Sequence, residues 1–76
     1  MTIGPDDLLG VARKALANAQ VYPTDVCLES YYKVGDEWHV DVVYTEPKTK
    51  YETTAALAVK TETGEIRGFW KGRRWK

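Results

Sequence analysis

The stretch EWHVDVVYTE, residues 37–46, decides the fold class. Its large apolar residues recur at every second position, and polar or charged residues stand between most of them. This alternation is typical of a β-strand that has one face against a core and the other toward solvent. The residues expected to face the core are Trp38, Val40, Val42 and Tyr44, and those expected to face outward are Glu37, His39 and Asp41.

The same two-residue period continues on both sides of this stretch. A tight turn at Gly35-Asp36 precedes it, a break at Pro47–Thr49 follows it, and a second turn lies at Glu62–Glu65 with Gly64 free to take positive φ. Strands joined by short connections pair in sequence order, which predicts an antiparallel meander. The four strands are expected at about residues 26–34, 37–46, 50–61 and 66–75.

The N-terminal part has helical rather than strand periodicity, and we expect one helix at about residues 4–20. Pro5 suits the first helical position, and Asp6 and Asp7 then lie where the helix dipole favours negative charge. Because the residue before a proline avoids the α region, Pro23 predicts that the helix ends close to Val21. The apolar stripe comprises Leu8, Leu9, Ala12, Ala15, Leu16 and Ala19.

These elements predict an α+β fold in a single domain, residues 1–76, with the N-terminal helix packed on a four-stranded antiparallel meander. The helix is expected to cover the Trp38 face and to leave the opposite face open to solvent. In the first strand we expect Val26, Leu28, Tyr32 and Val34 on the core side. The apolar residues expected on the open face are Tyr31, Val43, Ala56, Ala58 and Phe69, a set that suggests a partner surface or self-association as a homodimer.

The residue types needed for catalysis or metal binding are sparse. Cys27 is the single cysteine, so no intramolecular disulfide is possible, and His39 is the single histidine, without partners for a metal site. No phosphate-binding glycine loop or dinucleotide fingerprint is present. We therefore expect no enzyme activity and no cofactor. We expect a cytoplasmic protein without membrane insertion, because neither a signal peptide nor a long apolar run occurs.

The charges are unevenly distributed although the formal net charge is zero. Residues 1–46 hold eight acidic against three basic residues, and residues 47–76 hold eight basic against three acidic residues. Such asymmetry suggests a polar partner or self-complementary association. The alternative is a solvated basic end without a partner.

The C-terminal run GFWKGRRWK, residues 68–76, has the highest density of residues typical of binding sites. Tryptophan and arginine are enriched in protein–protein hot spots, which predicts a protein partner. Interleaved basic and aromatic residues also bind single-stranded nucleic acid, which is the alternative function. We rank it second, because the acidic first half and the zero net charge disfavour long-range attraction to phosphates. The candidate contacts in this run are Phe69, Lys71, Arg73, Arg74 and Trp75.

Residues 25–76 resemble the gas vesicle protein O family. The residues that carry the resemblance are Trp38–Val43, Glu46-Pro47, Tyr51, Thr63–Phe69 and Arg73–Trp75. The resemblance implies a cytoplasmic accessory protein in gas vesicle formation that acts by protein–protein contact without a cofactor. It adds Glu46 to the candidate contacts and again selects Arg73, Arg74 and Trp75.

The chain departs from that family's pattern at two places. It has Arg74-Trp75 where family members end Arg-Tyr, and Tyr51-Glu52-Thr53 where they have Tyr-x-Val. The helix-plus-meander outline is also similar to cystatin-like and PepSY-type modules. Since the Gln-Val-Gly loop of inhibitory cystatins is absent, protease inhibition is only a third option.

Overall fold

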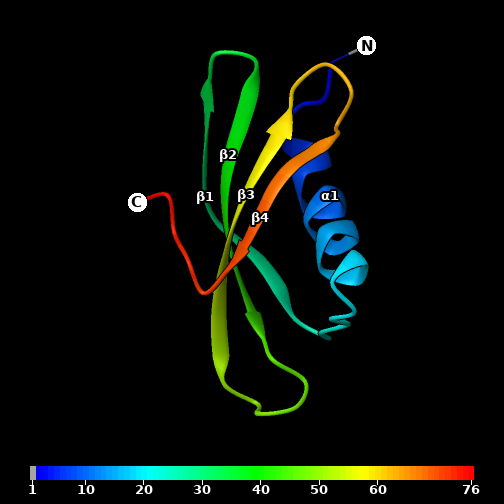
Figure 1. Cartoon of the computed structure of the whole chain (residues 1–76), viewed down its shortest axis with the longest axis vertical. Coiled ribbons are helices and arrows are strands. Elements are labelled where there is room, and N and C mark those ends of the chain that lie inside the picture. The colour runs from blue at the N-terminus through cyan, green and yellow to red at the C-terminus, as the bar shows by residue number, and fades with distance from the viewer. Residues whose placement is uncertain (1) are drawn as a thin grey trace.

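The computed structural model describes residues 2–76 and has one helix and one sheet. The helix α1, Pro5–Asn18, is followed by β1, Val26–Val34; β2, Glu37–Thr45; β3, Glu52–Lys60; and β4, Ile66–Lys71. The strands pair antiparallel in the order β1-β2-β3-β4, and α1 lies on one side of the sheet (Figure 1). The predicted α+β fold is confirmed. Within residues 2–76, no helix has the length and apolar character that crossing a membrane requires.

The start of α1 follows from its sequence, whereas its end does not lie where proline predicts. The Gly4 N–H donates to Asp7 Oδ2 at 2.9 Å, so the side chain satisfies one backbone donor outside the helix. At the other end the N–H of Val21 donates to the carbonyl of Leu16 at 2.8 Å, while Gln20 has a φ of 62°. This is a Schellman ending, with a left-handed residue just past the helix, and it stops α1 at Asn18, before the region of Pro23.

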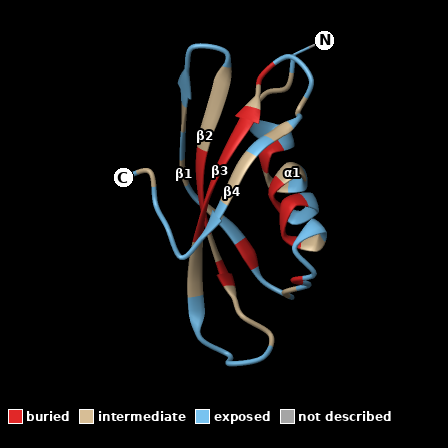
Figure 2. Cartoon of the chain, viewed as in Figure 1, coloured by how far each residue is buried: buried red, intermediate tan, exposed pale blue. Residues whose placement is uncertain are grey.

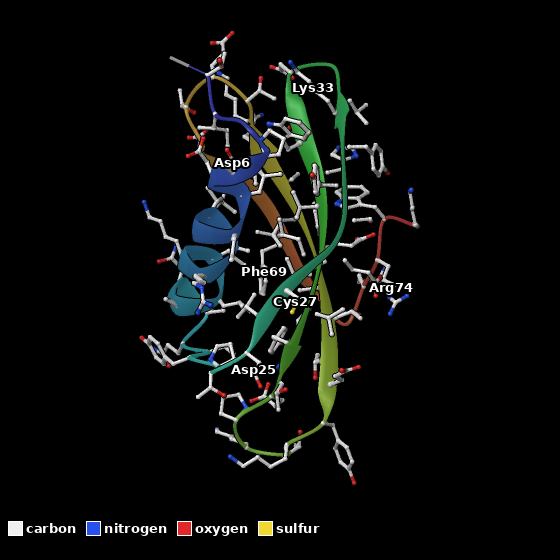
Figure 3. The ribbon with its side chains drawn as sticks, turned by 180° about the vertical axis from the view of Figure 1, so that it is seen from behind. Asp6, Asp25, Cys27, Lys33, Phe69 and Arg74 are labelled. Carbon is white, nitrogen blue, oxygen red and sulfur yellow. The ribbon has the colours of Figure 1, made fainter. Side chains whose placement is uncertain are left out.

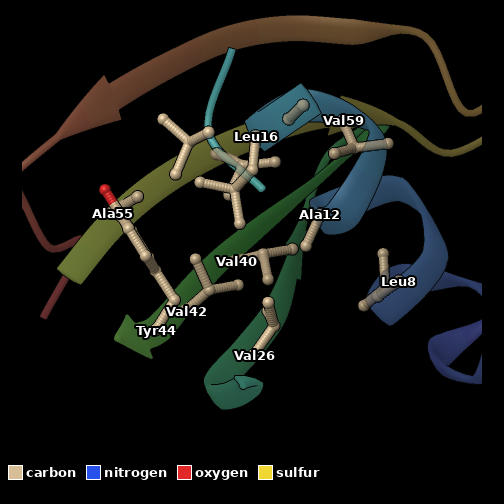
Figure 4. Close-up of a cluster of buried hydrophobic side chains, with 12 residues drawn as sticks. Leu8, Ala12, Leu16, Val26, Val40, Val42, Tyr44, Ala55 and Val59 are labelled. Carbon is tan, nitrogen blue, oxygen red and sulfur yellow. The ribbon is translucent and has the colours of Figure 1, made fainter. Parts of the chain in front are cut away.

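The core lies between α1 and the sheet (Figure 2). The predicted inward residues of β2 pack there, with Val40, Val42 and Tyr44 almost fully buried and Trp38 partly buried. Figure 4 shows Val40, Val42 and Tyr44 with Leu8, Ala12 and Leu16 of the helix and Ala55 and Val59 of β3. The other main members of this cluster are Leu8, Ala12, Ala15, Leu16, Val26, Ala55, Leu57 and Val59.

A bulge in β1 reverses the side-chain directions predicted for the second half of the strand. The register of β1 against β2 shifts between Leu28 and Ser30, so the side chains after this point change faces. Tyr31 therefore packs edge-on against Trp38, with ring centroids 6.0 Å apart, and Tyr32 packs against His39 at 5.6 Å. The expectation that Tyr32 and Val34 face the core and Tyr31 the open face was wrong, because simple alternation ignores a bulge; Val34 pairs with Glu37 and is 47% exposed.

Three strands are shorter than predicted, and only the last difference changes the architecture. β2 ends at Thr45 and β3 begins at Glu52, each within two residues of the prediction. β4 ends at Lys71 rather than near residue 75, because Gly72 takes a φ of 79°, a conformation that glycine adopts easily and that ends the strand. The segment Gly72–Lys76, here called the tail segment, then leaves the sheet on the side opposite α1 (Figure 1).

Candidate functional site

The face of the sheet opposite α1, here called the tail face, is partly covered by the tail segment and is not open as predicted. Trp75 is the centre of this cover. Its indole lies parallel to the ring of His39, with centroids 3.9 Å apart and an interplanar angle of 7°. Its Nε1–H donates to the carbonyl of Leu57 at 2.7 Å, and its ring meets Trp70 edge-on at 5.4 Å. Stacking and hydrogen bonding together fix this residue on the sheet.

The tail segment also explains a buried carboxylate. Asp41 was expected to face solvent, but it is only 1% exposed. Its Oδ1 accepts the backbone N–H of Trp75 at 2.7 Å, and its Oδ2 accepts the hydroxyl of Ser30 at 3.0 Å. A buried charge requires such hydrogen bonds, so the position of Asp41 depends on the docked tail segment.

Arg74 and Lys76, the residues on either side of Trp75, each lie close to a group of complementary charge or polarity. An oxygen of Glu29, in the β1 bulge, lies 3.1 Å from Nη2 of Arg74. Nζ of Lys76 lies 5.7 Å from the centroid of the Tyr32 ring, within cation–π range. The acidic first half and the basic C-terminal end are thus partly complementary within one chain.

Trp70 and Phe69 occupy opposite faces of β4. Phe69 pairs with Leu57 and packs against the core, so its predicted place on the open face was wrong (Figure 3). Trp70 pairs with Ala56 on the tail face and remains 44% exposed. Its ring lies over Gly68, where an added Cβ would approach Trp70 Cη2 to 2.2 Å. Glycine at position 68 therefore makes room for an aromatic ring two residues away on the same face.

Glu46 and Lys71 form an ion pair away from the tail segment. Nζ of Lys71 lies 3.0 Å from Oε2 of Glu46, at the end of the sheet where Tyr44 is buried. This contact lowers the pKa of Glu46 and raises the pKa of Lys71. Burial raises the pKa of Tyr44, whose hydroxyl has no hydrogen-bond partner within residues 2–76. Both charged groups are engaged with each other in the folded chain.

The structure thus divides the six predicted contact residues into four sets. Phe69 packs against the core, and Glu46 and Lys71 pair with each other. Arg74 and Trp75 are used within the chain to hold the tail segment. Arg73 is exposed and makes no ion pair within residues 2–76. It lines a shallow hollow of about 190 Å³ with Ala56, Trp70, Arg74 and Trp75.

The sequence interpretation missed the residues that receive the tail segment. Asp41, His39 and Glu29 were read as outward-facing positions of ordinary strands. The one signal that pointed to them was the charge asymmetry, since it suggested self-complementary association. Across residues 2–76, no group of three or more histidine, cysteine, aspartate or glutamate residues is arranged to hold a metal ion.

Comparison with protein-family models, with curated proteins and with solved structures gives no match to this chain.

Proposed function

We propose that the protein is a non-catalytic protein-interaction module and that Trp70 and Arg73 are the centre of its contact surface. The observation that supports this most strongly is that the Trp70 side chain is exposed and yet held in one position. The ring is 44% exposed, yet Gly68 below it and Trp75 beside it restrict its motion. An aromatic anchor already held in place loses little entropy on binding, which is a property of interface hot spots.

Arg73 supplies the charge of this surface. Its guanidinium is exposed beside the hollow, whereas that of Arg74 is paired with Glu29. An exposed arginine beside an exposed indole fits a partner surface that presents a carboxylate next to an apolar side chain. The partner chemistry we propose is therefore an acidic protein surface.

A more specific form of the proposal is an accessory role in gas vesicle formation. The support for this form is the resemblance of residues 25–76 to the gas vesicle protein O family. In that case the partner is another protein of the vesicle assembly, and the same surface makes the contact.

The proposal is tested by an affinity pull-down from source-cell lysate, with and without nuclease, using the wild type and Arg73→Glu. The matched control is Lys14→Glu, which makes the same change of charge at an exposed position of α1. We expect discrete proteins that survive nuclease, are retained by Lys14→Glu and are lost with Arg73→Glu. Identification of those proteins tests the gas vesicle form directly.

Two results contradict the proposal. If Arg73→Glu captures the same proteins as the wild type, the contact surface lies elsewhere. If the captured material is nucleic acid and the proteins disappear with nuclease, the single-stranded nucleic-acid alternative is favoured instead, and its affinity should fall steeply with salt.

A further inference from the structure

The tail segment meets the sheet as a short peptide meets a binding groove. Three successive residues are each received by a different group of the tail face. Arg74 meets the carboxylate of Glu29, Trp75 meets His39, Asp41 and the Leu57 carbonyl, and Lys76 lies over Tyr32. These groups together select a segment with the pattern basic–tryptophan–basic.

The tail segment is attached to the sheet by a residue suited to act as a hinge. Gly72 has a φ of 79°, and no atom lies within 4 Å of the position its Cβ would occupy. Its N–H donates to the carbonyl of Thr54 at 2.7 Å, so the sheet pairing continues up to the hinge. A change of backbone conformation at this one residue redirects everything after it while β4 stays paired.

We propose that the tail face is a docking groove for the tail segment of a second copy of this chain. Two chains would exchange residues 72–76 reciprocally, each using its own hinge at Gly72. Every contact of the closed chain is then formed again between the chains, which is the energetic basis of segment swapping. The occupant is a second copy because its tail segment has the pattern that the groove selects: its Arg74 complements the Glu29 carboxylate, and its Trp75 backbone N–H is the donor that Asp41 accepts. The inference does not depend on the partner proposed for Trp70 and Arg73.

A charge-swapped pair of full-length variants tests the exchange. In Glu29→Lys, a positive groove residue faces the positive Arg74 of the same chain. In Arg74→Glu, a negative tail residue faces the negative Glu29 of the same chain. When the two variants are mixed, each tail segment meets an oppositely charged groove only in the other chain. Both positions are exposed, so the core is untouched. The double variant Glu29→Lys/Arg74→Glu restores the pair within one chain and is the matched control.

We expect size-exclusion chromatography with light scattering to show dimers in the mixture at roughly ten times the fraction found in either variant alone. The double variant should remain as monomeric as the wild type at the same concentration. A mixture that contains no more dimer than its two components overturns the proposal.

A second test acts on the hinge itself. Gly72→Val places a β-branched residue where positive φ is required, which disfavours the closed tail segment through local backbone strain, while its Cβ meets no other part of the chain within 4 Å. We expect the dimer fraction to rise roughly tenfold relative to the wild type, because the left-handed conformation is disfavoured in the closed monomer. Adding Trp75→Ala to Gly72→Val should abolish the dimer. If the double variant still forms the dimer, the dimer uses another surface and the exchange is contradicted. The exchange is also contradicted if Gly72→Val has the same dimer fraction as the wild type.

Discussion

Replacement of Trp75 by alanine should destabilise the protein more than its place near the end of the chain suggests. The indole loses a hydrogen bond to Leu57 that contributes about 1 kcal/mol. Its stack on His39 and its edge contact with Trp70 contribute about 1 kcal/mol beyond burial. Trp75 is mostly buried, and the roughly 100 Å² that it hides beyond what a compact unfolded chain already hides contributes about 2 kcal/mol.

The gross loss of about 4 kcal/mol is partly offset, because residues 75 and 76, once released, regain about 2 kcal/mol of backbone freedom while Arg74 stays paired with Glu29. We therefore expect the free energy of unfolding to fall by about 2 kcal/mol, out of roughly 4–11 kcal/mol for a domain of this length. In urea unfolding followed by far-ultraviolet circular dichroism, the midpoint should move by about 1–2 M at an unchanged slope.

Two variants serve as controls for this measurement. Trp75→Phe keeps a ring on His39 but loses the indole N–H, so we expect a loss of about 1 kcal/mol. Tyr51→Ala removes an aromatic side chain from a residue that is 75% exposed, and the expected change lies within about 0.5 kcal/mol. If Trp75→Ala is no more destabilising than Tyr51→Ala, the tail segment is not docked in solution and the reasoning is refuted.

Two further changes test the packing of β4 and its ion pair. Gly68→Ala should destabilise by about 1–3 kcal/mol, because the new Cβ forces the Trp70 ring away, whereas Gly10→Ala on the exposed side of α1 should stabilise by about 0.5–1 kcal/mol. Equal effects of the two substitutions in thermal unfolding would contradict the described position of the Trp70 ring. Hydrogen bonding to Lys71 lowers the pKa of Glu46 from its usual 4.5. The unfolded chain therefore binds more protons in acid than the folded chain does. As a result, the stability contributed by this pair disappears as the pH falls through the lowered pKa. In urea titrations, the free energy of unfolding of Lys71→Gln should therefore fall less than that of the wild type between about pH 6 and pH 3. If both proteins lose the same free energy of unfolding over this range, the pair does not form.

The architecture could be predicted from the sequence because it depends on local signals that agree with one another. Alternation in residues 37–46 identified β2 and its buried face, and Pro5 with its following aspartates identified the start of α1. These features act over a few residues, so no knowledge of distant neighbours is needed.

The tail face could not be predicted in the same way, because its contacts join residues that are far apart in the sequence. Asp41 alternates with valines as an ordinary outward-facing residue would, and its burial depends on Trp75, 34 positions away. The bulge beside Glu29 leaves no glycine or proline as a marker, yet it decides which of two tyrosines faces the core. The last strand was predicted to continue through Gly72 to about residue 75, whereas Gly72 ends it.

The distance in sequence between the tail segment and its groove has a consequence for the order of folding. Everything needed for the core under α1 precedes Gly72, so that side of the sheet can close before the tail segment docks. The other side has to wait for Trp75. Until then Asp41, Ala56 and Ala58, which end up 1%, 3% and 4% exposed, have solvent as their neighbour. The folding chain thus passes through a stage with one finished face and one unfinished face, and the docking of Trp75 completes the second.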